Sequence, residues 1–203
     1  MVRQSRFRTA SRRAALVAAA AALTGCSSSV VVQSDFPAPL VEPLPLRMGV
    51  IFDDELHNYI YYEELPQHTA WTIDMGDANV GMLEPLFNGM FSQVALIDSI
   101  DEAPVANVDG VLVPQLEKFE FDVPIGRRDE FAEVWLQYAL TLFEPNGNVV
   151  HRWTVSGYGK SELVRDQEDA VKRAAVVALR DVGATIATRF SEQQPIRYWL
   201  GAR

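Results

Sequence analysis

The stretch Phe131–Phe143, FAEVWLQYALTLF, is followed by EPNGN at 144–148 and by Val149–Ser156, VVHRWTVS, and this stretch decides the fold. Strict alternation of apolar residues is typical of a half-buried strand. In the first arm it is carried by Val134, Leu136, Tyr138, Leu140 and Leu142. Asparagine followed by glycine favours a tight turn, because both residues adopt positive φ at low cost. The sequence therefore predicts a long β-hairpin in the middle of a sheet.

A long helix is predicted after this hairpin. Gly157-Tyr158-Gly159 is expected to break the second arm, and the helix is expected from about Gln167 to Phe190, capped by Asp166. One apolar stripe with helical spacing should lie on the sheet. It comprises Val171, Ala175, Ala178, Val182, Ile186 and Phe190. Pro195 is expected to end any helix, which leaves residues 196–203 as a tail.

The first half of the chain predicts further strands around one more helix. Strands are expected at 46–52, 58–65, 69–75, 93–98 and 110–123. The last should be interrupted near Pro114, and an acidic turn should cover 53–55. Asp77 can cap a helix that contains Pro85, which should kink it or delay its start to about Glu84. This order predicts one α+β domain over 47–203, with a largely antiparallel sheet and both helices on one face.

The first 25 residues have the layout of a signal peptide. An arginine-rich start precedes an apolar run at 14–23, which is too short to span a membrane. The run ends in Leu23-Thr24-Gly25-Cys26, which resembles the lipobox of bacterial lipoproteins. That resemblance implies cleavage before Cys26 and attachment of fatty acyl groups such as palmitate to Cys26. Ser27, in place of an aspartate, implies anchoring in the outer membrane, facing the periplasm. An ordinary signal peptide with a chance cysteine is the alternative.

Residues 26–46 read as a tether between the lipid and the domain. Three serines and four prolines predict an extended, partly polyproline II segment. The three valines at 30–32 are compatible with a short strand. The segment is interpreted as a spacer, and a peptide ligand is the alternative.

The charge of the chain from Cys26 onward argues against two kinds of partner. The leader carries five of the eighteen basic residues and none of the twenty-seven acidic ones, so thirteen basic residues remain against twenty-seven acidic and the formal charge is −14. Such an excess argues against nucleic acid and against electrostatic docking on anionic lipid. Cys26 is the only cysteine, so its acylation would leave no thiol for a disulfide or a metal.

No motif in the chain predicts catalysis or a cofactor. His57 follows the acidic turn and could help bind a divalent cation, although a solvated turn is the simpler interpretation. His68 is expected in a loop and His151 on a sheet face. Gly157–Ser161 resembles a phosphate-binding loop only superficially, because its spacing is wrong. We therefore expect a protein that is not an enzyme and has no metal and no cofactor.

Aromatic residues are the candidates for partner binding. They are Tyr59, Tyr61, Tyr62, Tyr198 and Trp199, whereas alternation assigns Trp71, Trp135 and Trp153 to the core. The order of elements from Leu46 to Phe190 is similar to that of small α/β domains of outer-membrane accessory lipoproteins. Such a resemblance implies a non-enzymatic accessory or scaffold role in an envelope assembly, with an envelope protein as partner. A periplasmic binding module for a small molecule or glycan is the alternative, and a hydrolase with scattered catalytic residues is a third.

Overall fold

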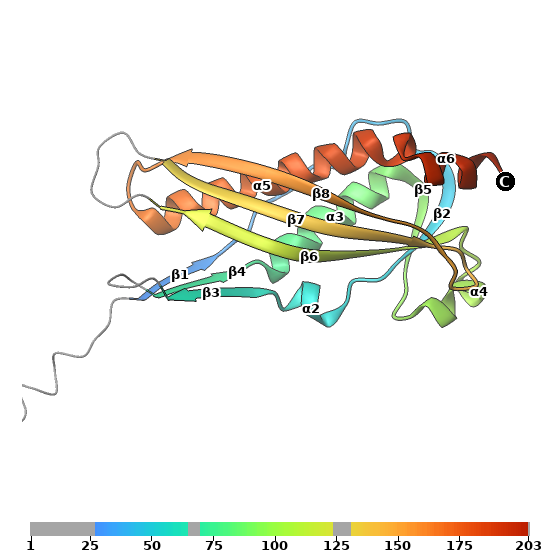
Figure 1. Cartoon of the computed structure of the whole chain (residues 1–203), viewed down its shortest axis with the longest axis horizontal. Coiled ribbons are helices and arrows are strands. Elements are labelled where there is room, and N and C mark those ends of the chain that lie inside the picture. The colour runs from blue at the N-terminus through green and yellow to red at the C-terminus, as the bar shows by residue number, and fades with distance from the viewer. Residues whose placement is uncertain (1–26, 65–69, 124–130, 203) are drawn as a thin grey trace, which may run out of the picture.

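Two β-sheets and the helices packed on them form an α+β fold, as predicted (Figure 1). The computed structural model describes residues 27–64, 70–123 and 131–202. The strands are β1 (Ser27–Val31), β2 (Leu44–Val50), β3 (Ile60–Glu64), β4 (Ala70–Asp74), β5 (Phe91–Leu96), β6 (Gly110–Asp122), β7 (Phe131–Phe143) and β8 (Val149–Glu162). The helices are α2 (Asp54–His57), α3 (Gly76–Met90), α4 (Ala103–Ala106), α5 (Gln167–Arg189) and α6 (Gln194–Gly201), with 3-10 turns η2 (Ile100–Glu102) and η3 (Phe190–Glu192).

The predicted hairpin is present, but it lies at one side of a five-stranded sheet with the order β5-β2-β6-β7-β8, so its expected place in the middle of the sheet was wrong. β7 is flanked by β6 and β8, and both pairings are antiparallel. β2 runs parallel to both β5 and β6. The alternating apolar residues of β7 are buried on one face of this sheet, as expected from their spacing. β8 itself is an edge strand.

Helix α5 lies against β8 at a short distance that two glycines permit. A side chain at Gly159 would overlap the backbone carbonyl oxygen of Ala174, and one at Gly157 would lie 2.5 Å from the Val182 side chain. These glycines were expected to break the strand, which was wrong, because β8 continues to Glu162. Their role is instead to let a helix approach closely. The predicted cap at Asp166 is confirmed, since its carboxylate accepts the N–H of Asp169.

Helix α3 packs beside α5 on the same face of the large sheet (Figure 1). Asn79 of α3 is fully buried, accepts a hydrogen bond from the Tyr138 hydroxyl of β7 and donates to the Leu56 carbonyl. Asp77 is in the first turn and is not the cap, contrary to expectation. The carboxylate of Asp74 accepts the first helical N–H, that of Gly76. The helix also runs through Pro85 from Gly76 onward, so the predicted late start is wrong.

The second sheet is small and has the order β1-β4-β3. β1 pairs in parallel with β4, and β3 pairs antiparallel with β4. Val30, Trp71 and Ile73 are buried on its inner face. β1 belongs to the fold, so the folded part begins earlier than the expected boundary near residue 47. The extended connection after it also packs on the core, through Phe36 and Val41.

Three smaller expectations are corrected. Residues 53–55 do not form a simple turn, because Asp53 caps the short helix α2 by accepting the Leu56 N–H. β6 is continuous through Pro114, and its bulge lies at Glu117. Proline is tolerated there because β2 pairs with β6 only as far as Leu112, so no ladder bond is lost on that side. Pro195 starts α6 instead of ending helical structure, as suits proline in a first turn.

Within the described residues, no helix combines the length and the apolar character that crossing a membrane requires.

Candidate functional site

The aromatic residues predicted to contact a partner fall in two separate places. Tyr59, Tyr61 and Tyr62 lie in or beside β3 of the small sheet, whereas Tyr198 and Trp199 lie in α6 near the opposite end of the molecule (Figure 1). The structure therefore does not bring these residues together in one site.

Two of the tyrosines near β3 are directed into the protein. The ring of Tyr61 lies 4.9 Å from the ring of Phe119, and its hydroxyl donates to Glu63 at 2.8 Å. Burial, and then this hydrogen bond, raise the pKa of Tyr61 well above its usual value. Burial also raises the pKa of Tyr59. Tyr61 thus contributes to packing of the small sheet on the large one, and Tyr59 is partly buried against the core.

The other predicted residues differ in their access to solvent. Tyr62 is 62% exposed and Tyr198 is 72% exposed, so both could contact another molecule. Trp199 is only 8% exposed, because it packs over Gly110 at the start of β6. The C-terminal tail is therefore a short helix held by Trp199, with Tyr198 on its outer side.

An exposed aromatic pair that the sequence reasoning missed lies on the open face of the large sheet. Trp135 of β7 and Tyr158 of β8 are directly opposite in the pairing, and their ring centroids are 5.4 Å apart. Each is 40% exposed. Trp135 was assigned to the core, which was wrong. Its position between Val134 and Leu136, both buried, places it on the other face, and this alternation was a usable signal.

Charged groups hold this aromatic pair in place. The Tyr158 hydroxyl donates to Glu133 at 2.7 Å, and the Lys160 ammonium lies 3.3 Å from the same carboxylate. The hydrogen bond from Tyr158 lowers the pKa of Glu133 and raises that of the tyrosine. Lys160 also lies over the ring of Phe131, 4.0 Å from its centroid. We call these four residues, together with Trp135, the aromatic cluster.

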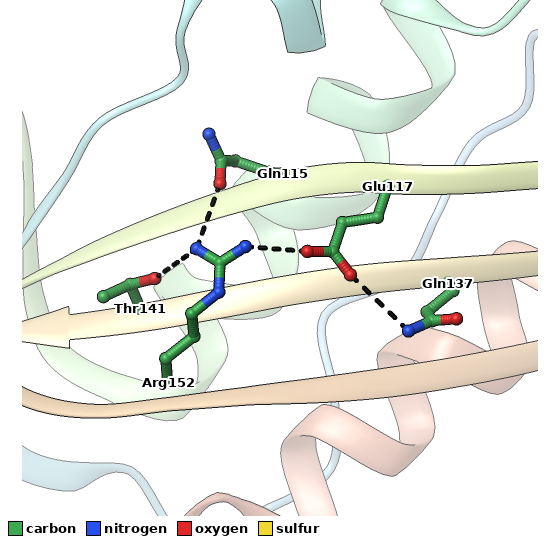
Figure 2. A network of polar contacts seen from close by, with 5 residues as sticks. All are labelled: Gln115, Glu117, Gln137, Thr141 and Arg152. Carbon is green, nitrogen blue, oxygen red and sulfur yellow. Dashed lines mark hydrogen bonds and ion pairs between the residues drawn. The ribbon is translucent and has the colours of Figure 1, made fainter.

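A polar network occupies the same open face further along the strands (Figure 2). Arg152 of β8 donates to Glu117 at 2.7 Å, and also to Thr141 and Gln115 at 3.2 and 3.3 Å. Gln137 donates to the second oxygen of Glu117 at 3.5 Å. Because Arg152 and Glu117 are partly exposed, their ion pair should stabilise the fold by no more than about 1 kcal/mol. The network ties three strands together and presents a fixed polar surface.

An apolar groove lies on the other side of the molecule, between the connection at 36–41 and the helices α3 and α5. Its volume is about 410 Å³. The floor is formed by Met82 and Leu86 of α3 with Gly183 and Ala187 of α5. Arg180 is the one charged residue in its lining, and its guanidinium lies 6.0 Å from the ring centroid of Phe36.

The remaining candidates for chemistry do not converge in the described part of the chain. No group of three or more His, Cys, Asp or Glu residues there could hold a metal ion. The His57 ring contacts the Asp53 carbonyl and the Phe52 ring, and His151 stacks on Trp153. Gly157–Ser161 is part of a continuous strand and forms no loop. Cys26 with its lipobox and His68 lie outside the described residues.

No protein-family model and no curated protein sequence matches this chain. Among solved structures, protein XCC0632 from Xanthomonas campestris, which carries the family model DUF330, is similar with a TM-score of 0.54 and 15% identity over 84% of this chain and 99% of that one. This likeness shows a shared fold. A minor lipoprotein from Acinetobacter baumannii (TM-score 0.39, 12% identity, 73% and 94% covered) and lipoprotein GNA1162 from Neisseria meningitidis (0.36, 9%, 73% and 100%) are similar only at a level that supports no argument.

Proposed function

We propose that this chain is a non-enzymatic lipoprotein, anchored through Cys26 in the outer membrane and facing the periplasm, which serves as an accessory or scaffold subunit of an envelope assembly. The anchor rests on the lipobox resemblance at Leu23–Cys26. The scaffold role rests on surfaces of the folded domain.

The observation that carries the scaffold role is the aromatic cluster on the open face of the large sheet. Aromatic residues are the commonest anchors of protein interfaces. Trp135 and Tyr158 are exposed, yet Glu133 and Lys160 fix their surroundings. A partner would therefore find a preorganised surface, and little side-chain entropy would be lost on binding.

The test is photo-crosslinking in cells from a light-activated amino acid placed at Trp135. A discrete adduct with one envelope protein is expected, because this position is the centre of the cluster. The matched control is the same amino acid at Val177, which is 42% exposed on α5 and lies outside the cluster. A second control is Cys26→Ala, which should release the protein from the membrane and remove the adduct. Equal adducts from positions 135 and 177, or none from 135, would contradict the scaffold role.

The apolar groove favours a second candidate, a binding module for a small apolar molecule. Its volume of about 410 Å³ falls in the range of ligand pockets, and its lining is apolar except for Arg180. Ala184 lines the groove, so Ala184→Phe should fill it. We expect this variant to lose binding of a fluorescent fatty acid, whereas Val177→Phe on the same helix should keep it. Unchanged binding in Ala184→Phe would contradict this role for the groove.

A further inference from the structure

Strand β1 begins at Ser27, the residue that follows Cys26 in the sequence. It is held from this first residue, because Ser27 pairs with Ala70 and the pairing continues to Val31 with Asp74. The Ser29 N–H also donates to Glu168 at the start of α5, at 3.3 Å. One residue spans at most about 3.6 Å. A lipid on Cys26 would therefore be joined to the folded domain with no spacer between them.

The outer face of the small sheet carries exposed apolar side chains. Val31, Ile60 and Tyr62 are 47%, 58% and 62% exposed. They share this face because Val31 and Ile60 both pair with Asp74, and Tyr62 pairs with Thr72 two residues away. Val31 and Ile60 lie on the two strands that flank β4, and Tyr62 lies two residues from Ile60, so this face exposes apolar surface to water.

The composition of this face suits one kind of membrane surface. Tyrosine with aliphatic neighbours is typical of groups that enter the boundary between headgroups and acyl chains. Asp74 and Glu64 lie on the same face, and the chain as a whole is strongly acidic. Carboxylates are repelled by anionic lipid but attracted by ammonium groups. The matching surface is therefore a zwitterionic bilayer, and phosphatidylethanolamine is the best fit because its primary ammonium can donate hydrogen bonds to these carboxylates.

We infer that the outer face of the small sheet, through Val31, Ile60 and Tyr62, rests on the phosphatidylethanolamine bilayer that holds the lipid of Cys26. The inference depends on the lipid anchor proposed above. α6 lies at the far end of the molecule from the start of β1 (Figure 1), so Tyr198 would be held away from the bilayer.

The test uses the full lipidated protein in phosphatidylethanolamine liposomes that contain a quencher at headgroup depth. Because acylated Cys26 has no free thiol, Tyr62→Cys and Tyr198→Cys each provide one site for a fluorescent label. Both positions are exposed, so neither change should disturb the fold. We expect quenching to be about threefold stronger at position 62, because that side chain should enter the interface. Equal quenching at both positions would overturn the inference.

Two further experiments distinguish the contribution of the lipid anchor from that of the outer face of the small sheet. A flexible insert of about twenty residues after Cys26 should weaken quenching at position 62 while the protein still floats with the liposomes. Replacing the lipid with phosphatidylglycerol should weaken it as well, and unchanged quenching there would overturn the choice of lipid. Failure of the unmodified protein to float would overturn the anchor, and the inference with it. Flotation with equal quenching would overturn this inference alone.

Discussion

The two sheets of this molecule are built on different scales. The strands β6, β7 and β8 have 13 or 14 residues, and α5, with 23 residues, packs along β7 and β8. The strands of the small sheet have five residues each, and few of their side chains are buried. Stability therefore resides mainly in the large sheet with α5. The small sheet packs on the large sheet and α5, and its outer face is exposed to solvent.

The largest effect is expected where α5 meets β8. In Gly159→Val the new side chain would overlap the backbone of Ala174 and lie 2.5 Å from the backbone nitrogen of Ala178. We expect a loss of more than about 3 kcal/mol in the free energy of unfolding, measured by urea denaturation followed by circular dichroism.

The control for this change is Gly81→Ala on α3. Nothing lies within 4 Å of a side chain at position 81, which is exposed. This variant should gain about 0.5–1 kcal/mol, because glycine is a poor helix former. A Gly159→Val protein as stable as the wild type would show that α5 does not depend on close approach to β8.

A smaller loss in the free energy of unfolding is expected from Tyr138→Phe, which tests how α3 is joined to the large sheet. The change leaves the buried Asn79 side-chain oxygen without its donor. We expect a cost of about 1–3 kcal/mol, measured by the same denaturation. Tyr158→Phe removes a hydroxyl that donates to Glu133 at the surface, and should lower the free energy of unfolding by much less. Similar costs for both variants would contradict this difference in burial.

The small sheet is tested by neighbouring valines that point to opposite faces. Val30 is 3% exposed and Val31 is 47% exposed. Val30→Ala should cost about 1–2 kcal/mol, because it leaves a small cavity, whereas Val31→Ala should be nearly neutral. Hydrogen exchange should quicken in β1 and β4 of the Val30 variant and stay unchanged in β7 and β8. Faster exchange in all these strands would show that the two sheets unfold as one unit.

Tyr61 and Tyr138 should change the pH dependence of the free energy of unfolding, with little effect at neutral pH. Burial raises the pKa of Tyr61 in the small sheet and of Tyr138 in the large one. In the unfolded chain both should lose their protons near pH 10. The folded protein then holds more protons, so the free energy of unfolding should fall as the pH rises above about 10. Tyr61→Phe should reduce this slope in denaturation measured from pH 9 to 11, and an unchanged slope would contradict the effect at Tyr61.

Patterns within one strand or helix predicted the large sheet well. The alternation of β7 and the cap and stripe of α5 depend on neighbouring residues alone, so the sequence contains them in full. The prediction of a strand break at Gly157 and Gly159 was wrong, because a glycine in a strand can indicate either a break or the close approach of another element. Only the packing of α5 distinguishes these meanings. The predicted interruption near Pro114 was wrong for a similar reason, since a proline is tolerated there only because β2 stops pairing with β6 before it.

The candidate surfaces were less predictable. β1 has three serines in its five residues, and it is a strand because β4 and Glu168 of α5 lie beside it. The exposure of Trp135 follows from alternation, but its pairing with Tyr158 depends on the register across the hairpin. The groove between the connection at 36–41 and the two helices arises from tertiary packing, and no local pattern indicates it.

The hydrogen bond from Ser29 to Glu168 joins residues 139 positions apart in the chain. Contacts this distant in sequence form late, because a long loop must close first. β7, β8 and α5 follow one another directly and can assemble from local contacts. We therefore expect β1, which precedes the other described strands in the sequence, to be among the last to take up its native contacts. Pulsed hydrogen exchange during refolding should protect β7 and β8 before β1, and simultaneous protection would refute this order.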